Sequence, residues 1–207
     1  VDEAWQALAA DTPEGHAAVG WLALQLAIPP SYASPMYPSA GVAVAAGVVF
    51  GWPGTVGGGL GAFAVNMGLA AARGTVDPLS VALLPAVIGI GAGLQAAVGL
   101  MLLRRFVGLP LMLQAPREIL RFSLLAGPVA CVVNALVSTT ALVLSGVVPA
   151  NDAAVTVATW WVGDALGVLI AAPIVLSLVG RPRAAWTPRR AAVALPMLVG
   201  TLLLAVA

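Results

Sequence analysis

A single carboxylate, Asp164, lies near the middle of a long apolar run that extends from about Val155 to Val179. At about 1.5 Å of rise per residue, a helix over this run can cross a bilayer, and Asp164 then lies near mid-membrane. An ionisable side chain is unfavourable at that depth, so Asp164 should face the protein interior and have a polar or aqueous partner. Two aromatic side chains, Trp160 and Trp161, precede it by about one helical turn.

The helical spacing allows Asp164 two alternative roles. Trp160, Asp164 and Gly167 recur at intervals of three or four residues, and they therefore share one side of the predicted helix with Ala171. This side could form a binding pocket, with indole walls, an anionic or protonatable anchor and space left by glycine. Alternatively, Asp164 bonds to a neighbouring helix and holds the helix bundle together. Both roles remain open at the level of sequence.

Polar partners for Asp164 are few. Asn66, Gln95 and Asn134 each lie within a different apolar run, and each amide could donate to Asp164 or instead to a nearby backbone carbonyl. Tyr37 and Ser39 end a proline-rich segment that could close the pocket from outside. The candidate ligand-binding residues are the polar and aromatic side chains inside or beside these runs: Asp164, Trp160, Trp161, Asn66, Asn134, Tyr37, Ser39 and Gln95.

Several other kinds of chemistry lack the residues they need. His16 is the only histidine and Cys131 the only cysteine, whereas a metal site requires several ligands. The sequence has no phosphate-binding loop, no Ser-His-Asp set and no pair of carboxylates at mid-membrane depth. We therefore expect no catalysis, no metal and no cofactor in this region, and we expect Cys131 to pack as a small hydrophobic residue.

The composition is that of a membrane protein. Of the 207 residues, 61% are hydrophobic and 8% are charged, and the mean hydropathy is +1.03. A soluble domain of this length could not bury so much apolar surface. The predicted fold class is therefore all-α, a polytopic transmembrane helix bundle.

The apolar runs predict about seven helices. They cover approximately residues 16–28, 40–50, 55–72, 79–103, 119–147 and 155–179, and a last run begins near 191. The first two are short and could be tilted helices or a re-entrant pair. Trp52-Pro53-Gly54 signals a turn, and the prolines between 29 and 39 preclude a regular helix there.

Two domains are expected, a cytoplasmic surface segment over residues 1–15 and a transmembrane domain over residues 16–207. The sequence begins without methionine and stops inside an apolar run, so we expect it to be a piece of a longer protein.

Arginine placement predicts the orientation. One group, Arg104, Arg105, Arg117 and Arg121, fills one connection, and a second group lies between residues 181 and 190. Cytoplasmic loops are enriched in basic residues, so both connections and the N-terminus should be cytoplasmic. Such arginines are more typical of topology signals and lipid-headgroup contacts than of a nucleic-acid site.

Small residues recur four apart at Gly57 and Gly61, at Gly89 and Gly93, and at Gly163 and Gly167. Such spacing lets helix backbones approach closely. We interpret these pairs as packing inside the bundle, with a homodimer seam as the alternative.

Several segments together resemble the MASE1 integral membrane sensory domain family. They are Pro30 to Gly41, Trp52-Pro53-Gly54, Gly61 to Asn66, Arg104-Arg105 with Arg121-Phe122, and above all Trp160 to Gly167 with Ala172-Pro173. The resemblance extends from about Trp21 to the end of the chain. It implies a bacterial inner-membrane sensor of about eight helices. It also implies a C-terminal cytoplasmic output domain in the same chain, either a histidine kinase or a cyclic-di-GMP enzyme.

The leading hypothesis is therefore a sensor that detects an unknown small ligand, or the state of the membrane lipids around it. Two alternatives remain. One is a small-solute transporter or its membrane substrate-binding subunit, which would also have broken segments and a polar site at mid-membrane. The other is a scaffold subunit of a membrane complex, in which the polar residues only pack.

Overall fold

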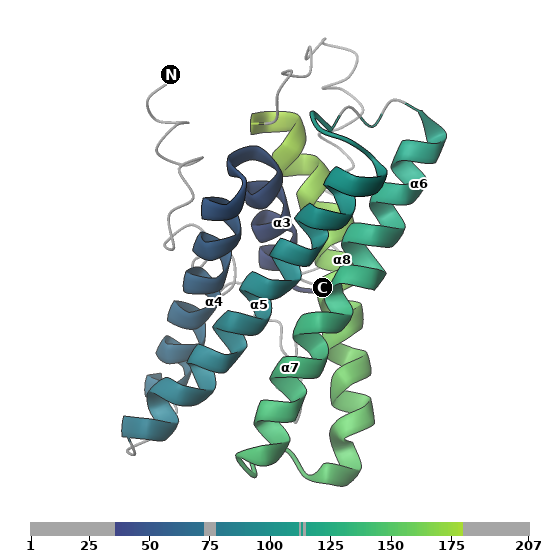
Figure 1. Cartoon of the computed structure of the whole chain (residues 1–207). Helices are drawn as coiled ribbons and strands as arrows, with labels where there is room; N and C mark the ends of the chain where they lie inside the picture. Colours follow the sequence, from purple (N-terminus) through teal and green to yellow (C-terminus); the bar gives the residue numbers. More distant parts are fainter. Residues whose placement is uncertain (1–35, 73–77, 112, 114, 180–207) are drawn as a thin grey trace, which may run out of the picture.

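The computed structural model describes residues 36–72, 78–111, 113 and 115–179 (Figure 1). This part of the chain is helical and contains no strand, which confirms the predicted all-α class. The elements are α3 (Pro38–Phe50), α4 (Trp52–Ala72), α5 (Pro78–Phe106), α6 (Pro116–Leu124), a π-helical turn η1 (Leu125–Val129), α7 (Ala130–Leu144), a 3₁₀ turn η2 (Ala150–Asp152) and α8 (Ala153–Val179). The runs predicted at 16–28 and from 191 onward lie outside the described residues, as does most of the proline-rich segment. The expectation of no helix in that segment is wrong for Pro38 and Ser39, which begin α3, because proline is tolerated in the first turn of a helix.

Three helical stretches within the described residues are long and apolar enough to cross a membrane. They are Val81–Phe106, Pro116–Leu144 and Ala150–Val179, and α3 is a shorter apolar helix. A helix that is apolar all round belongs in the interior of a bundle. Accordingly, α3 is buried along most of its length and lies among α4, α5 and α8 (Figure 1).

The reversal between α3 and α4 differs from the predicted turn. Gly51 alone makes the turn, with a positive φ of 75° that glycine adopts readily. Trp52, Pro53 and Gly54 instead form the first turn of α4, where proline is tolerated because its missing N–H would be unpaired anyway. Gly54 is required for packing, because a Cβ there would overlap the backbone of Ala46 in α3.

The predicted helix over 119–147 is one continuous stretch that contains a defect. Five residues around Pro128, Leu125–Val129, form the π-helical turn η1 between α6 and α7. Proline cannot donate a helical hydrogen bond, and a π turn is one way for a helix to accommodate this. The stretch ends at Leu144, earlier than predicted, and Gly146 follows with a φ of 72°.

The predicted internal packing of glycines is confirmed at two seams. Between α4 and α5, a Cβ on Gly89 would lie 2.8 Å from the carbonyl oxygen of Gly59, and Gly93 packs on the same residue. Between α3 and α8, a Cβ on Gly41 would lie 2.8 Å from the amide nitrogen of Ala172, and Gly167 packs against the backbone at Tyr37. These seams bring helix backbones together within one chain. The homodimer alternative stays a prediction.

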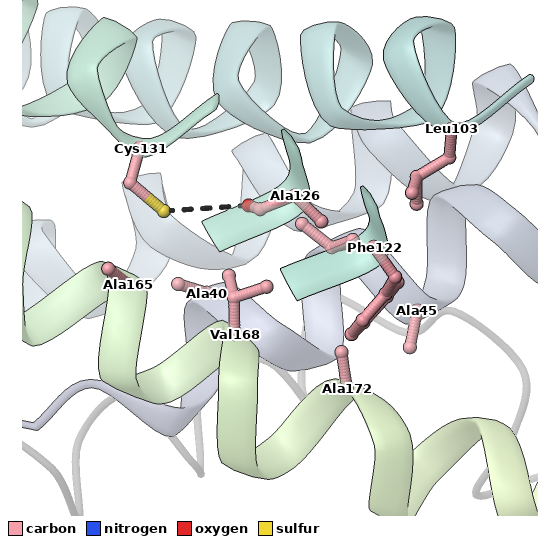
Figure 2. Close-up of a cluster of buried hydrophobic side chains, with 10 residues drawn as sticks. Ala40, Ala45, Leu103, Phe122, Ala126, Cys131, Ala165, Val168 and Ala172 are labelled. Atoms are coloured by element: carbon pink, nitrogen blue, oxygen red, sulfur yellow. Dashed lines mark hydrogen bonds between the residues drawn. The ribbon is translucent and has the colours of Figure 1, made fainter. Parts of the chain in front are cut away.

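Small side chains also dominate the main core cluster, which joins α3, α5, α6, α7 and α8 (Figure 2). Phe122 and Leu103 are its large members, and alanines such as Ala40 and Ala172 surround them. Because alanine allows close approach, the helices around α3 can hold polar side chains at fixed mutual positions.

The first group of arginines lies at one end of the bundle, where α5 ends and α6 begins (Figure 1). Arg121 donates to the carbonyl oxygen of Phe106 at 3.0 Å, and Arg105 lies over the Phe106 ring at 5.7 Å. The turn between α7 and α8, which carries Asn151 and Asp152, lies at the opposite end.

Candidate functional site

Asp164 lies on the face of α8 that is packed against the other helices. Its side chain is only 1% exposed, and the residues beside it and one turn away, Gly163, Ala165 and Gly167, are buried as well. The predicted inward orientation is therefore confirmed. Because these neighbours are small, the backbones of other elements can approach the carboxyl group closely.

The amide of Asn134 on α7 is the first partner of this carboxyl group. Its Nδ2 donates to Asp164 Oδ2 at 3.0 Å, and its Oδ1 accepts a hydrogen bond from Ser138 Oγ at 2.8 Å. Asn134 and Ser138 are both buried. The chain of bonds from Ser138 to Asp164 therefore joins α7 to α8 inside the bundle.

Gln95 on α5 is the second partner. Its side chain is 2% exposed and also hydrogen-bonds to Asp164. Asn134 and Gln95 thus follow the predicted donation to Asp164. Together with Ser138 they form a polar network that holds three helices, α5, α7 and α8, to one carboxyl group.

The end of the proline-rich segment forms the third side of the site. The backbone N–H of Tyr37 donates to the carbonyl oxygen of Gly163 at 3.0 Å, so this segment lies directly against α8. The side chains of Tyr37 and Ser39 hydrogen-bond to each other, and Tyr37 is close enough to Asp164 to interact with it electrostatically. The structure thus brings Tyr37 to Asp164, with Ser39 bonded to Tyr37.

The two tryptophans occupy different surroundings. Trp161 is half-buried, and its indole Nε1 donates to the carbonyl oxygen of Pro128 at 2.7 Å. That carbonyl belongs to the π-helical turn, so Trp161 joins α8 to the break between α6 and α7. Trp160 is half-buried one turn before Asp164. Both indoles were predicted to line a pocket at Asp164. The Trp161 indole instead donates its N–H to η1.

Asn66 lies away from the network, unlike Asn134 and Gln95. Its Nδ2 donates to the carbonyl oxygen of Ala62, one turn back on α4, at 2.8 Å. This is the backbone alternative that the sequence left open. Asn66 instead lines a separate cavity of about 750 Å³ between α4, α5 and α7.

The family model for MASE1 matches residues 14–207, nearly the whole chain. This chain belongs to the MASE1 family. MASE1 is a membrane sensory domain family, and its domains are sensory rather than catalytic. No curated protein and no solved structure matches the chain.

Two residues near Asp164 in this MASE1 domain were not among the predicted site residues. Gly91 on α5 is one, and a Cβ there would lie only 2.6 Å from Asn134 Oδ1. The sequence signal was its position four residues before Gln95, since residues four apart share a helix face. Without glycine at this position, α5 could not approach the amide of Asn134.

Cys131 is the second unpredicted residue. It is fully buried, and its Sγ lies 3.8 Å from the carbonyl oxygen of Ala126 (Figure 2). It is also close enough to Asp164 for an electrostatic interaction. It precedes Asn134 by one turn of α7, which was the available signal. It packs in the core as predicted.

Two polar atoms inside the bundle, one of them in the network, have no hydrogen-bond partner among the described residues. They are Gln95 Oε1 and Thr139 Oγ1, which are both buried. Buried polar atoms are nearly always hydrogen-bonded, to protein, water or a ligand. The described residues also contain no group of three or more histidine, cysteine or acidic side chains able to hold a metal. Gln95 Oε1 can therefore accept a further hydrogen bond, and the donors around Asp164 have an alternative acceptor close by.

Proposed function

We propose that this MASE1 domain is the signal-input module of a bacterial inner-membrane sensor. It detects a small ligand or the state of the membrane, and it regulates a C-terminal cytoplasmic output domain, either a histidine kinase or a cyclic-di-GMP enzyme. Family membership supports a sensory role. The single observation that carries the mechanism is the buried hydrogen bond between Asn134 and Asp164, which joins α7 to α8.

This bond is suited to a two-state device. An intramolecular hydrogen bond contributes about 0.5–1.5 kcal/mol net, so exchanging one partner for another changes the packing free energy only modestly. A stimulus shifts such an equilibrium by its difference in affinity for the two helix arrangements. Gln95 Oε1, which is buried and has no hydrogen-bond partner within residues 36–179 as far as they are described, offers an alternative acceptor beside the carboxyl group.

The position of α8 gives the change a route out of the membrane. Figure 1 shows that α8 ends at the same end of the bundle as the start of α6, the end that carries the arginines. By the distribution of basic residues this end is cytoplasmic. A shift of α8 relative to α7 would therefore reach the cytoplasmic side, where an output domain would receive it.

Output activity of the full-length protein in membrane vesicles tests this proposal. Asp164→Ala removes the acceptor, and we expect it to change basal output about fivefold or more, the effect of about 1 kcal/mol on a two-state equilibrium. Asp152→Ala is the matched control, since this acidic residue lies at the exposed start of the same helical stretch.

Asp164→Asn keeps the shape of the side chain and guards against a folding defect in the alanine variant. Equal output from wild type and both Asp164 variants, all inserted at equal levels, would exclude Asp164 as part of the switch.

A small-solute transporter is the second candidate, and the cavity between α4, α5 and α7 is the observation that favours it. The coding sequence beyond Ala207 distinguishes the candidates. A kinase or cyclase domain there supports sensing. A stop codon soon after one further helix favours transport or scaffolding.

A further inference from the structure

The cavity between α4, α5 and α7 is separate from the Asp164 network. Its volume is about 750 Å³, within the range of pockets that hold small organic molecules. It lies toward the end of the bundle at which α4 ends, α5 begins and α7 ends, opposite the arginines. In Figure 1, α4 and α5 diverge from α7 and α8 toward that end.

Local sequence explains why the helices separate there. Next to the network, Gly91 lets α5 approach α7, and a Cβ on Gly91 would lie 3.1 Å from Val137. Pro85, one and a half turns earlier on α5, lines the cavity and is buried. A proline inside a helix lacks the N–H for the carbonyl four residues back and favours a bend. The cavity therefore begins where close packing at Gly91 gives way to the segment around Pro85.

The lining specifies the chemistry of an occupant. Among the described residues that line the cavity none is charged, and most are aliphatic. The polar side chains that face it are Asn66, Thr140 and Ser145. Asn66 Nδ2 and Ser145 Oγ already donate to backbone carbonyls of their own helices. Asn66 Oδ1 and the Thr140 hydroxyl therefore remain as acceptors for a hydrogen-bond donor on an occupant.

We propose that this cavity binds an uncharged, largely apolar small molecule that carries a hydrogen-bond donor, of the kind represented by a long-chain alcohol. A charged headgroup would be buried without a counter-charge, which is unfavourable. An apolar chain fits the aliphatic walls, and its hydroxyl group can donate to the oxygens of Asn66 or Thr140.

The cavity is adjacent to the Asp164 network, and this part of the inference rests on the proposed function. Val137 lines the cavity and also packs against Gly91. Gly91 in turn packs closely against Asn134 Oδ1. An occupant that displaces Val137 would change the distance between α5 and α7 at Asn134. The hydrogen bond from Asn134 to Asp164 would then respond to occupancy.

Photolabelling tests the site directly. The probe is an uncharged long-chain alcohol that carries a diazirine, added to the full-length protein in lipid nanodiscs, with labelled peptides located by mass spectrometry. We expect saturable labelling of the end of α4, the start of α5 and the end of α7, and competition by the same alcohol without the diazirine. A quaternary ammonium probe with the same chain should label these segments at least about fivefold less.

Two variants fill the cavity from different helices. Ala141→Trp does so from α7 and Leu83→Trp from α5, and each should reduce labelling about fivefold or more. Val132→Trp is the matched control, because Val132 lies on α7 outside the cavity and is 41% exposed. It should leave labelling unchanged.

Three results would contradict the proposed binding site. They are labelling that does not saturate, equal labelling by the ammonium probe, and unchanged labelling in both tryptophan variants. Output of the same variants is measured separately. Saturable labelling together with unaltered output in Ala141→Trp would support the site and overturn its link to Asp164. The role of Asp164 in the proposed function is tested independently, by the Asp164 variants.

Discussion

At the scale of single residues, the site depends on glycine and other small residues as much as on polar side chains. Gly91 makes room for the Asn134 amide, and the small residues around Asp164 make room for Tyr37. Polar residues in apolar runs were readily found in the sequence, and Asn134 and Gln95 were among the candidate partners that the structure brings to Asp164. Asn66 was an equal candidate but donates to a backbone carbonyl of its own helix. Which polar side chains meet depends on how the helices are rotated about their axes, and a single sequence does not specify this rotation.

Gly91→Ala should destabilise the domain. Its Cβ would lie 2.6 Å from Asn134 Oδ1, so α5 or Asn134 must move, and overpacking of this kind costs about 1–3 kcal/mol. Thermal unfolding in detergent measures the effect. Gly68→Ala on α4 is the control, since nothing lies within 4 Å of its Cβ. Equal melting temperatures for the two variants would show that α5 is not closely packed on Asn134.

Trp161→Phe should weaken the contact between α8 and the π-helical turn. The variant retains an aromatic ring but loses the donor to the Pro128 carbonyl, and loss of one such bond costs about 0.5–1.5 kcal/mol. Trp52→Phe is the control, because Trp52 is 50% exposed. A larger loss of thermal stability in Trp52→Phe than in Trp161→Phe would be inconsistent with this role.

At the scale of helices, the described runs were predicted with accurate ends at Phe50, Ala72 and Val179, because long apolar stretches bounded by glycine, proline and charge leave little freedom. The π-helical turn at Leu125–Val129 was missed, since apolar periodicity does not reveal one extra residue in a turn. The start of α4 at Trp52 was also missed, because Trp52-Pro53-Gly54 is compatible with both a turn and a first helical turn.

Gly167→Ala tests the seam between α3 and α8. Its Cβ would overlap the Tyr37 carbonyl, so the two helices must separate where Tyr37 approaches Asp164. We expect a loss of stability of about 1–3 kcal/mol, as for other overpacked sites, measured by thermal unfolding. At Gly99 the nearest atoms to a Cβ lie 3.6 Å away, an ordinary contact, so Gly99→Ala should have little effect. Similar losses in both variants would argue against a specific seam.

At the scale of the whole molecule, the bundle has two chemically distinct ends. One end carries Arg104, Arg105, Arg117 and Arg121, and the other carries the cavity and the turn between α7 and α8. The orientation in the membrane follows from this asymmetry and stays a prediction, as does the inner membrane as its location.

Cysteine labelling in intact cells tests the orientation. In a Cys131→Ala background, Ser145→Cys at the cavity end should react with a membrane-impermeant maleimide without permeabilisation. Phe106→Cys, which is exposed at the arginine end, should react only after permeabilisation. The reverse pattern would mean that the domain is inserted the other way, and the route from α8 to a cytoplasmic output would be lost.

The most direct test of the proposed switch is a double-mutant cycle on Asp164 and Asn134, read out as basal output of the full-length protein. Both variants, Asp164→Ala and Asn134→Ala, break the same 3.0 Å hydrogen bond. The double variant should therefore match the single variants rather than sum their effects, because residues in contact are not additive. Fully additive effects on output, or no effect of either substitution, would contradict a signal that passes through this bond.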